Sequence, residues 1–232
     1  MELNSGSLRK TAKLAGALYL LLTITGAYVI LFVPSRIIVK GDAAATAANM
    51  LSHEFLFRTG IIGDLVSNTV WVLLALTLYR LFRQVNEPQA RLLVALVIVQ
   101  IPVVFVVEAL NIASLMIFKG ELLKTFELGQ RHDLAMFFLK INEYAMLTSE
   151  VFWGLWLIPF GRLVYASGFL PRVLGVLLMI GALGYVVESS AFLLFPAVHS
   201  IVSQYTFATY TIGEVSIMLW LLLKGVETEA KP

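Results

Sequence analysis

Residues 91–118 read RLLVALVIVQIPVVFVVEALNIASLMIF, and after Arg91 the only charged residue in this run is Glu108. A helix needs about 20 apolar residues to cross the roughly 30 Å hydrocarbon layer of a bilayer, so this run is long enough to span one. Five further apolar blocks have similar lengths: 12–33, 59–81, 134–161, 172–195 and 205–224. The sequence therefore predicts an all-α, polytopic membrane protein built as a six-transmembrane-helix bundle.

The composition excludes an ordinary soluble protein. Of the 232 residues, 59% are hydrophobic and 14% are charged, against roughly 45–50% and 25% in soluble domains, and the mean hydropathy is +0.86. A net charge of +2 gives no basic field for nucleic acid, and the absence of cysteine excludes disulfides and thiol catalysis. We predict a single integral membrane domain over residues 1–232, with the lipid bilayer as its surroundings.

The charges between the blocks predict the orientation. Six spans place both termini on one side, and the side with more Lys and Arg is expected to be cytoplasmic. The terminal side has ten such residues: Arg9, Lys10, Lys13, Arg80, Arg83, Arg91, Arg162, Arg172, Lys224 and Lys231. The other side has seven: Arg36, Lys40, Arg58, Lys119, Lys124, Arg131 and Lys140. We therefore predict a multi-pass protein with both termini in the cytoplasm.

Two local patterns concern packing. Asp42 is placed to cap an Ala-rich stretch, so we predict a short outer helix around 43–53 that lies at the membrane interface or folds back over the bundle. Small residues allow close approach of helices, and the fourth and fifth blocks contain Gly154, Gly161, Gly175, Gly181 and Gly184. The tryptophans lie mostly within the blocks, which favours core packing or the lining of a cavity over an aromatic belt: Trp71, Trp153, Trp156 and Trp220.

Six carboxylates lie inside the apolar blocks: Asp64, Glu108, Glu143, Glu150, Glu188 and Glu214. A charged group at the bilayer centre costs roughly 2.5–3.5 kcal/mol on insertion scales, so such residues are expected to face a partner, water or the bundle interior. Counted from the outer end of each block, Asp64 is about five residues in, Glu188 about seven and three others about nine or ten. Only Glu150 lies deeper. Matched depth on five helices predicts a polar chamber in the outer half of the bundle.

Polar and aromatic residues share the helix faces of these acids. Spacings of three, four or seven positions place side chains on one face of a helix, and these spacings add Asn68, Trp71, Asn111, Tyr185 and Tyr210 to the predicted pocket. Arg58 and Lys140, near the outer rim, are the cations closest to it, and two cations cannot neutralise six acids. Most of the acids must therefore carry a proton or be balanced by a bound cation. The alternative for each acid is a hydrogen bond between helices, worth ~0.6–2 kcal/mol.

No cofactor is predicted. Imidazole and carboxylate can together bind a divalent metal, and the weak candidates are His53, His132 and His199 at the outer ends of the blocks. None of the three has the spacing of a metal motif, which favours solvated or helix-capping histidines.

Several segments resemble a known family. The stretch 41–49, followed by Phe57, Arg58, Thr59, Gly60 and Asp64, is similar to the first half of the bacterial DUF4386 domain of unknown function, and residues 169–172 and 213–225 are similar to later parts of it. The resemblance implies a polytopic protein of the bacterial cytoplasmic (inner) membrane. It draws attention to Asp42, Arg58, Asp64 and Glu214, because these residues fall inside the matched motifs.

Three functions remain open. The first is acid/base chemistry on, or binding of, a small lipophilic substrate, with Asp64 and Glu214 as the acid/base pair and Asn68 and Tyr210 orienting the substrate. The second is a proton- or cation-coupled transporter or a ligand-binding sensor, which with six helices and no internal repeat would need a homodimer to form a pathway. The third is a structural accessory membrane subunit. A high-resolution density map would distinguish them. Lipid-like density beside Asp64 and Glu214 favours the enzyme, compact density coordinated by oxygens favours cation binding, and acids that point in different directions without a cavity exclude both.

Overall fold

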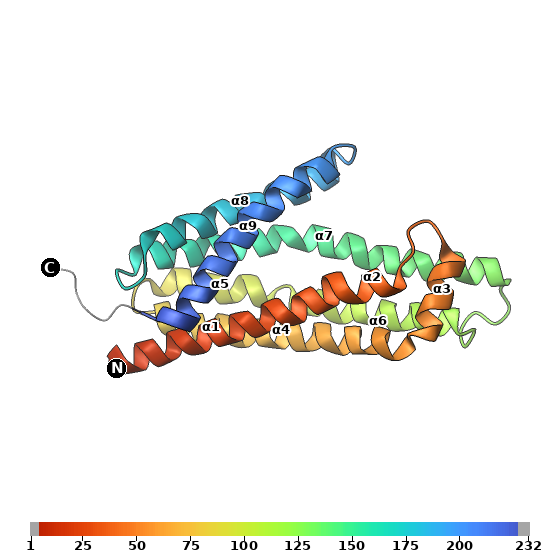
Figure 1. Ribbon diagram of the computed structural model, residues 1–232, viewed down its shortest axis with the longest axis horizontal. Coiled ribbons are helices and arrows are strands. Elements are labelled where there is room, and N and C mark those ends of the chain that lie inside the picture. The colour runs from red at the N-terminus through yellow and green to blue at the C-terminus, as the bar shows by residue number, and fades with distance from the viewer. Residues whose placement is uncertain (1–4, 227–232) are drawn as a thin grey trace. The chain divides into compact units, whose positions relative to one another are not determined.

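The computed structural model describes residues 5–226, so Lys231 of the terminal-side cations lies outside the described part. Within this range every regular element is a helix, which confirms the predicted all-α class. The first segment is α1 (Ser5–Ala27), a π-helical turn η1 (Tyr28–Phe32) and α2 (Val33–Ile37). Next come α3 (Ala43–Ser52), α4 (Glu54–Phe82), α5 (Glu87–Ile98), α6 (Ile101–Phe118), α7 (Leu128–Ala166), α8 (Arg172–Leu194), α9 (His199–Leu219) and the π-helical η2 (Trp220–Lys224) (Figure 1).

Five helical segments of the described chain are long and apolar enough to cross a membrane: Gly6–Ile37, Glu54–Phe82, Glu87–Phe118, Arg172–Leu194 and His199–Lys224. They correspond to five of the six predicted spans. The sixth predicted span, 134–161, lies within α7, whose 39 residues include Lys140, Glu143 and Glu150. These charges dilute its apolar character, so the count of six spans stays a prediction.

Local chemistry sets several helix ends. Asn86 accepts a hydrogen bond from the backbone N–H of Gln89 and begins α5, with Pro88 in the first turn. The predicted block 91–118 is two helices, α5 and α6, with a break after Ile98. Pro102 lacks an N–H and cannot bond the carbonyl four residues earlier, so the helix is interrupted there.

The predicted cap of the short outer helix is confirmed. Asp42 Oδ1 accepts a 2.8 Å hydrogen bond from the backbone N–H of Ala45, which begins α3. The helix buries Ala47 and Met50 in a hydrophobic cluster with residues of α2, α4, α6 and α7, and it lies beside α2 and α6. Whether this helix lies at the membrane interface or folds back over the bundle stays a prediction.

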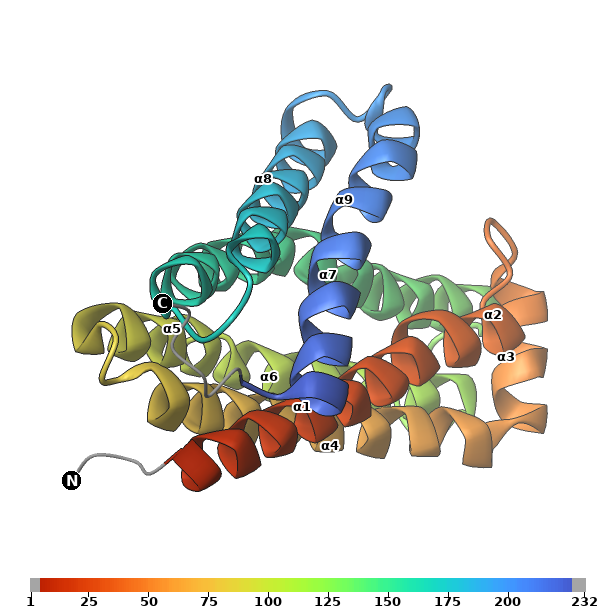
Figure 2. The same ribbon diagram turned by 60° about the vertical axis from the view of Figure 1, so that its left-hand side comes forward.

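The chain forms two compact units. Unit 1 comprises the described residues up to Leu21, Val70–Gln100 and those from Leu147 onward, and unit 2 comprises Leu22–Thr69 and Ile101–Met146. Helices α8 and α9 of unit 1 pack side by side, as Figures 1 and 2 both show. The prediction of one integral membrane domain is a statement about the whole chain and stays a prediction.

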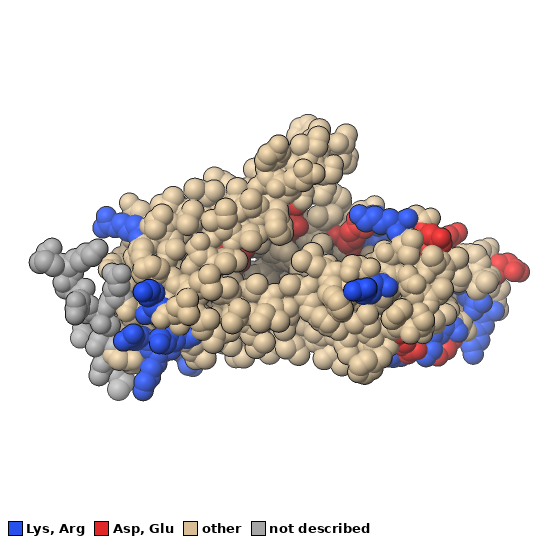
Figure 3. Space-filling view, in the orientation of Figure 1, with Lys and Arg blue, Asp and Glu red and all other residues tan. Residues whose placement is uncertain are grey.

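The cations divide between the two units as they divide between the two predicted sides of the membrane. The nine described Lys and Arg residues of the terminal side all belong to unit 1, and the seven of the other side all belong to unit 2. Figure 3 shows Lys and Arg of unit 1 gathered around the N-terminal end of α1 and the loop between α7 and α8. Unit 2 mixes both signs of charge in the same view.

The predicted close approach of helices at glycine is found in unit 1. A Cβ atom at Gly175 of α8 would lie 2.5 Å from the carbonyl oxygen of Gly161 in α7, and one at Gly213 of α9 would lie 2.7 Å from the carbonyl oxygen of Leu177 in α8. Such distances are too short for any side chain. The absence of Cβ therefore lets the backbones of α7, α8 and α9 meet, which places the polar residues of these helices near one another.

Candidate functional site

The six predicted acids divide equally between the two units. Unit 1 contains Glu150 of α7, Glu188 of α8 and Glu214 of α9, and unit 2 contains Asp64, Glu108 and Glu143. The predicted acid/base pair therefore takes Asp64 from unit 2 and Glu214 from unit 1. Asp64 and Glu214 each have their own hydrogen-bond partners, and their action as an acid/base pair stays a prediction.

Glu214 is held by two tyrosine hydroxyls. Tyr19 of α1 donates a 2.6 Å hydrogen bond to Oε2, and Tyr185 of α8 donates a 2.7 Å hydrogen bond to Oε1. Hydrogen bonds to a carboxylate are among the stronger ones in proteins. With both oxygens engaged, Glu214 is fixed in one orientation and joins three helices.

Glu188 is satisfied in a similar way. Its side chain is only 4% exposed, Ser203 of α9 donates a 2.5 Å hydrogen bond to Oε1, and Thr206 donates a 2.7 Å hydrogen bond to Oε2. Both donors lie on one face of α9, in the stripe that continues at spacings of four through Tyr210 to Glu214.

Glu150 differs from both of these acids. It is 6% exposed, and its Oε2 is buried with no hydrogen-bond partner among the described residues. Its carboxyl group lies close enough to Glu188 for their charges to interact. A buried acceptor without a donor costs about 1–3 kcal/mol, so a native protein is expected to have a reason to keep it.

Aromatic rings surround these acids. Tyr185 and Tyr210 stack with their centroids 4.0 Å apart, and Trp153 meets the Tyr185 ring edge-on at 6.0 Å. Trp71 lies 6.4 Å from Trp153 and 5.7 Å from Trp156, which in turn lies 6.1 Å from Tyr19. We call the following residues the carboxylate–aromatic cluster: Tyr19, Trp71, Glu150, Trp153, Trp156, Tyr185, Glu188, Tyr210 and Glu214.

Part of this cluster is accessible and part is closed. Trp153, Tyr185, Tyr210 and Glu214 are half-buried. Trp71 is only 8% exposed, and its indole Nε1, a hydrogen-bond donor, has no partner among the described residues. The cluster thus contains one unpartnered buried acceptor, on Glu150, and one unpartnered buried donor, on Trp71.

Unit 2 contains a second polar network. Asn68 Nδ2 donates to Asp64 Oδ1 at 3.1 Å, Asn111 Nδ2 donates to Glu108 Oε2 at 3.1 Å, and Asn142 Nδ2 donates to Asn111 Oδ1 at 3.0 Å. The carboxyl groups of Asp64 and Glu108 also interact with each other. Two carboxyl groups can share a hydrogen bond only when one of them carries a proton.

The predicted rim cations have other partners. Arg58 forms a 2.8 Å ion pair with Glu54 rather than with Asp64. Lys140 forms a 2.7 Å ion pair with Glu143, and both of these side chains are 48% exposed. Glu143 is therefore an exposed, paired carboxylate and does not share the surroundings of the five other acids.

The three histidines lie in separate surroundings. His53 hydrogen-bonds to Ser52 and to the Asn49 carbonyl, His132 meets the ring of Phe118, and His199 meets the ring of Phe192. Among residues 5–226 no group of three His, Asp or Glu side chains is arranged to hold a metal ion. The divalent metal considered from the sequence has no ligand set in this part of the chain.

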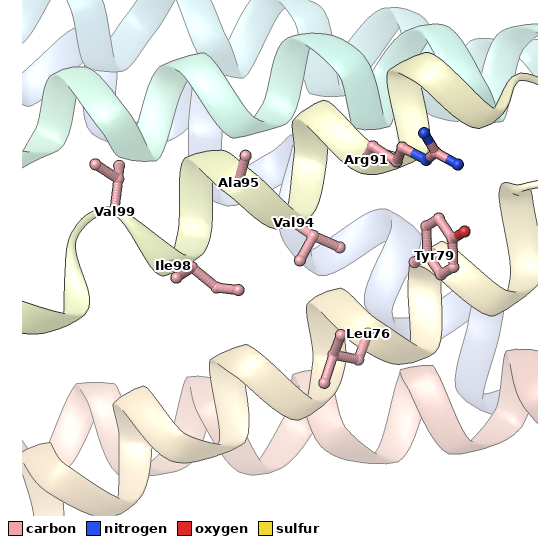
Figure 4. Close-up of a pocket in the computed structure, with 7 residues that line it drawn as sticks. All are labelled: Leu76, Tyr79, Arg91, Val94, Ala95, Ile98 and Val99. Atoms are coloured by element: carbon pink, nitrogen blue, oxygen red, sulfur yellow. The ribbon is translucent and has the colours of Figure 1, made fainter.

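The structure also has an open groove of about 650 Å³ between α4 and α5 in unit 1. Figure 4 shows its lining, which is apolar apart from Tyr79 and Arg91 at one end. None of the predicted site residues lines this groove. It is thus separate from the carboxylate-lined pocket predicted from the sequence.

Sequence spacing found much of the cluster and missed some of it. Trp71, Tyr185 and Tyr210 were predicted from their positions relative to acids. Tyr19 was missed because its partner, Glu214, is 195 residues away in the chain. Ser203 and Thr206 were missed as well, although the helical spacing from Ser203 through Thr206 and Tyr210 to Glu214 is a signal that would have found them.

Comparisons with known proteins give a family. The family model of DUF4386, described as "Domain of unknown function", matches residues 14–225. An uncharacterized protein of Archaeoglobus fulgidus is 34% identical over 101 residues, which are 44% of this chain and 56% of that protein. This chain therefore covers only a little over half of that relative. No solved structure matches.

Proposed function

The chain belongs to the DUF4386 family, and we propose that this member is a membrane protein that binds a small lipophilic substrate at the carboxylate–aromatic cluster and exchanges protons with it. The observation that carries the proposal is the unpartnered Oε2 of Glu150, buried beside Glu188. The rings of Trp153, Tyr185 and Tyr210 supply an apolar, partly exposed surface for the body of the substrate.

The acids of the cluster are suited to different tasks. Glu214 and Glu188 each accept two hydroxyl hydrogen bonds, which fixes their positions. Glu150 is the acid with a buried oxygen that has no hydrogen-bond partner among the described residues, so we assign it the contact with the substrate. In its protonated form it would give a proton to one carbon of an alkene, and the neighbouring Glu188 carboxylate would take a proton from another carbon, so that the double bond moves and the substrate is isomerised without a change in composition.

Deuterium wash-in tests this chemistry. Purified protein would be incubated in D₂O with a total lipid extract, and mass spectrometry would search for a compound that gains deuterium at a carbon position. We expect wash-in with the wild type and its loss in Glu150→Gln. Glu121→Gln is the matched control, because Glu121 pairs with Lys119 outside the cluster. If no compound binds or gains deuterium with the wild type, the proposal fails.

A proton- or cation-coupled carrier is a second candidate, favoured by the interacting carboxyl groups of Asp64 and Glu108 in unit 2. Asn68 donates to Asp64 and Asn111 donates to Glu108, which positions the two carboxyl groups, and a carrier needs such intramembrane acids to bind and release a proton. Proton flux in proteoliposomes would distinguish the two functions. A carrier predicts flux that Asp64→Asn and Glu108→Gln abolish, whereas the enzyme predicts none.

For the location we propose the bacterial cytoplasmic membrane, with both termini in the cytoplasm. The support is the excess of positive charge on the terminal side. Unit 1 has nine described Lys and Arg residues there, and Glu87 is its one described acid outside the predicted spans. Reporter fusions at the C-terminus, active only in the cytoplasm, would test it. If these fusions are inactive, and C-terminal fusions to a reporter that works only in the periplasm are active, the predicted orientation is wrong.

A further inference from the structure

The carboxylate–aromatic cluster has a marked electrostatic character. It contains Glu150, Glu188 and Glu214, and the hydroxyls that donate hydrogen bonds to Glu188 and Glu214 are neutral. On the three helical segments that carry these acids, the basic residues nearest to them in sequence are Lys140, Arg172 and Lys224. Each lies ten or more positions from the acid of its own helix, which is roughly 15 Å or more along the axis. The cluster therefore lacks a local cation along these helices.

The buried Oε2 of Glu150 would be stabilised by a hydrogen-bond donor from a ligand. Oε2 of Glu150 can accept two hydrogen bonds, and the described residues supply none. A cationic donor would satisfy this oxygen and would also interact favourably with Glu188, whose charge acts on Glu150. A neutral donor would do only the first.

The aromatic rings favour the same kind of ligand. The stacked pair Tyr185 and Tyr210 and the neighbouring Trp153 present ring faces and edges in the half-buried part of the cluster. An ammonium group is attracted to an aromatic face within about 6 Å, and an aliphatic or aromatic body packs against the same rings. Resting on the binding function proposed above and not on its proton-transfer step, we infer that the ligand is a lipophilic amine whose ammonium group donates to the ionised Glu150 carboxylate.

A metal ion is a poorer match for the same acids. A hard cation such as Ca²⁺ takes six to eight oxygen ligands. The oxygens of Glu188 and Glu214 already accept hydrogen bonds from hydroxyls, and the described residues contain no group of three acids or histidines arranged around one ion. An ammonium group can instead donate one hydrogen bond to the free oxygen of Glu150 and direct its other N–H groups toward aromatic faces.

The experiment uses three probes of nearly equal size and shape: 4-phenylbutylamine, 4-phenylbutanol and 4-phenylbutanoate. Isothermal titration calorimetry with the full-length protein in detergent would measure each Kd, with empty micelles as the blank. We expect the amine to bind at least tenfold more tightly than the alcohol, and the carboxylate to bind most weakly. Glu150→Gln should bring the amine and the alcohol within about twofold of each other, and Glu121→Gln should leave the wild-type ratio unchanged.

Each outcome decides the inference. Glu150→Gln has no described hydrogen bond at Oε2 to lose, so it is expected to fold, and Glu150→Asp, which keeps the charge, should retain an amine preference. If the alcohol binds the wild type as tightly as the amine, the amine inference fails while the binding function stands. An amine preference that survives Glu150→Gln overturns the assignment of Glu150. If none of the probes binds, and no lipophilic compound co-purifies, the binding function itself fails.

Discussion

Replacing the two buried acids of unit 1 by leucine should change stability in opposite directions. Glu150 and Glu188 are buried to a similar degree, at 6% and 4% exposure, and Leu is close to Glu in size. The difference lies in their hydrogen bonds. Glu188 accepts from Ser203 and Thr206, whereas Glu150 Oε2 accepts from no described residue.

The expected magnitudes follow from these contacts. In Glu150→Leu an unsatisfied buried oxygen is removed, so the free energy of unfolding should rise by about 1–3 kcal/mol. In Glu188→Leu two interhelical hydrogen bonds are lost. Such bonds average about 0.6 and reach about 1.7 kcal/mol in a membrane protein, so the free energy of unfolding should fall by about 1–3 kcal/mol.

Thermal unfolding of purified protein in one detergent is the assay. For a chain of this length each kcal/mol corresponds to roughly 2–4 °C in Tm, so the two variants should differ by several degrees in opposite directions from the wild type. Glu150→Leu should also lose ligand binding while gaining stability. If Glu150→Leu lowers Tm as much as Glu188→Leu does, then Glu150 holds the helices together and the reasoning on its free oxygen is refuted.

Three further substitutions test the packing and surface contacts. Gly175→Ala should lower the free energy of unfolding by about 1–3 kcal/mol, because the new methyl group would lie 2.5 Å from the Gly161 carbonyl oxygen; a Tm equal to that of the wild type would mean that α7 and α8 do not meet there. Asp42→Ala removes the cap of α3 and should cost about 0.5–2 kcal/mol. Its effect is measured by faster amide hydrogen exchange in α3, and Asp42→Asn should largely restore protection. Lys140→Met breaks an exposed ion pair with Glu143 and should change the free energy of unfolding by less than about 1 kcal/mol in chemical denaturation; a larger loss would show that the pair is more buried than described.

Much of the helical framework follows from the sequence because it depends on local properties. The apolar blocks predict where the long helices lie, Asp42 supplies a cap, and the breaks near Asn86 and Pro171 lie between blocks. The interruption near Gln100 was missed because the residues around Pro102 are uniformly apolar, which hides a backbone break from a hydropathy pattern.

The list of site residues was predictable only in part. Glu188 and Tyr185, or Glu214 and Tyr210, are related by helical spacing, so a sequence places them on one face. Tyr19 joins Glu214 from another helix, and Arg58 turns to Glu54 four positions away instead of to Asp64. Sequence spacing identifies residues that share a face of one helix. It carries no information on which other helix packs against that face.

The sequence by itself determined that six carboxylates lie in apolar helices and that few cations are near them, because composition and periodicity belong to the chain. Tertiary structure alone decided which of the acids are satisfied. Glycine contacts bring α7, α8 and α9 together, so hydroxyls of one helix reach Glu188 and Glu214 on others, while Oε2 of Glu150 is left without a donor. The physical reason is that a hydrogen bond requires two groups within about 3 Å, and for groups on different helices that distance is set by packing.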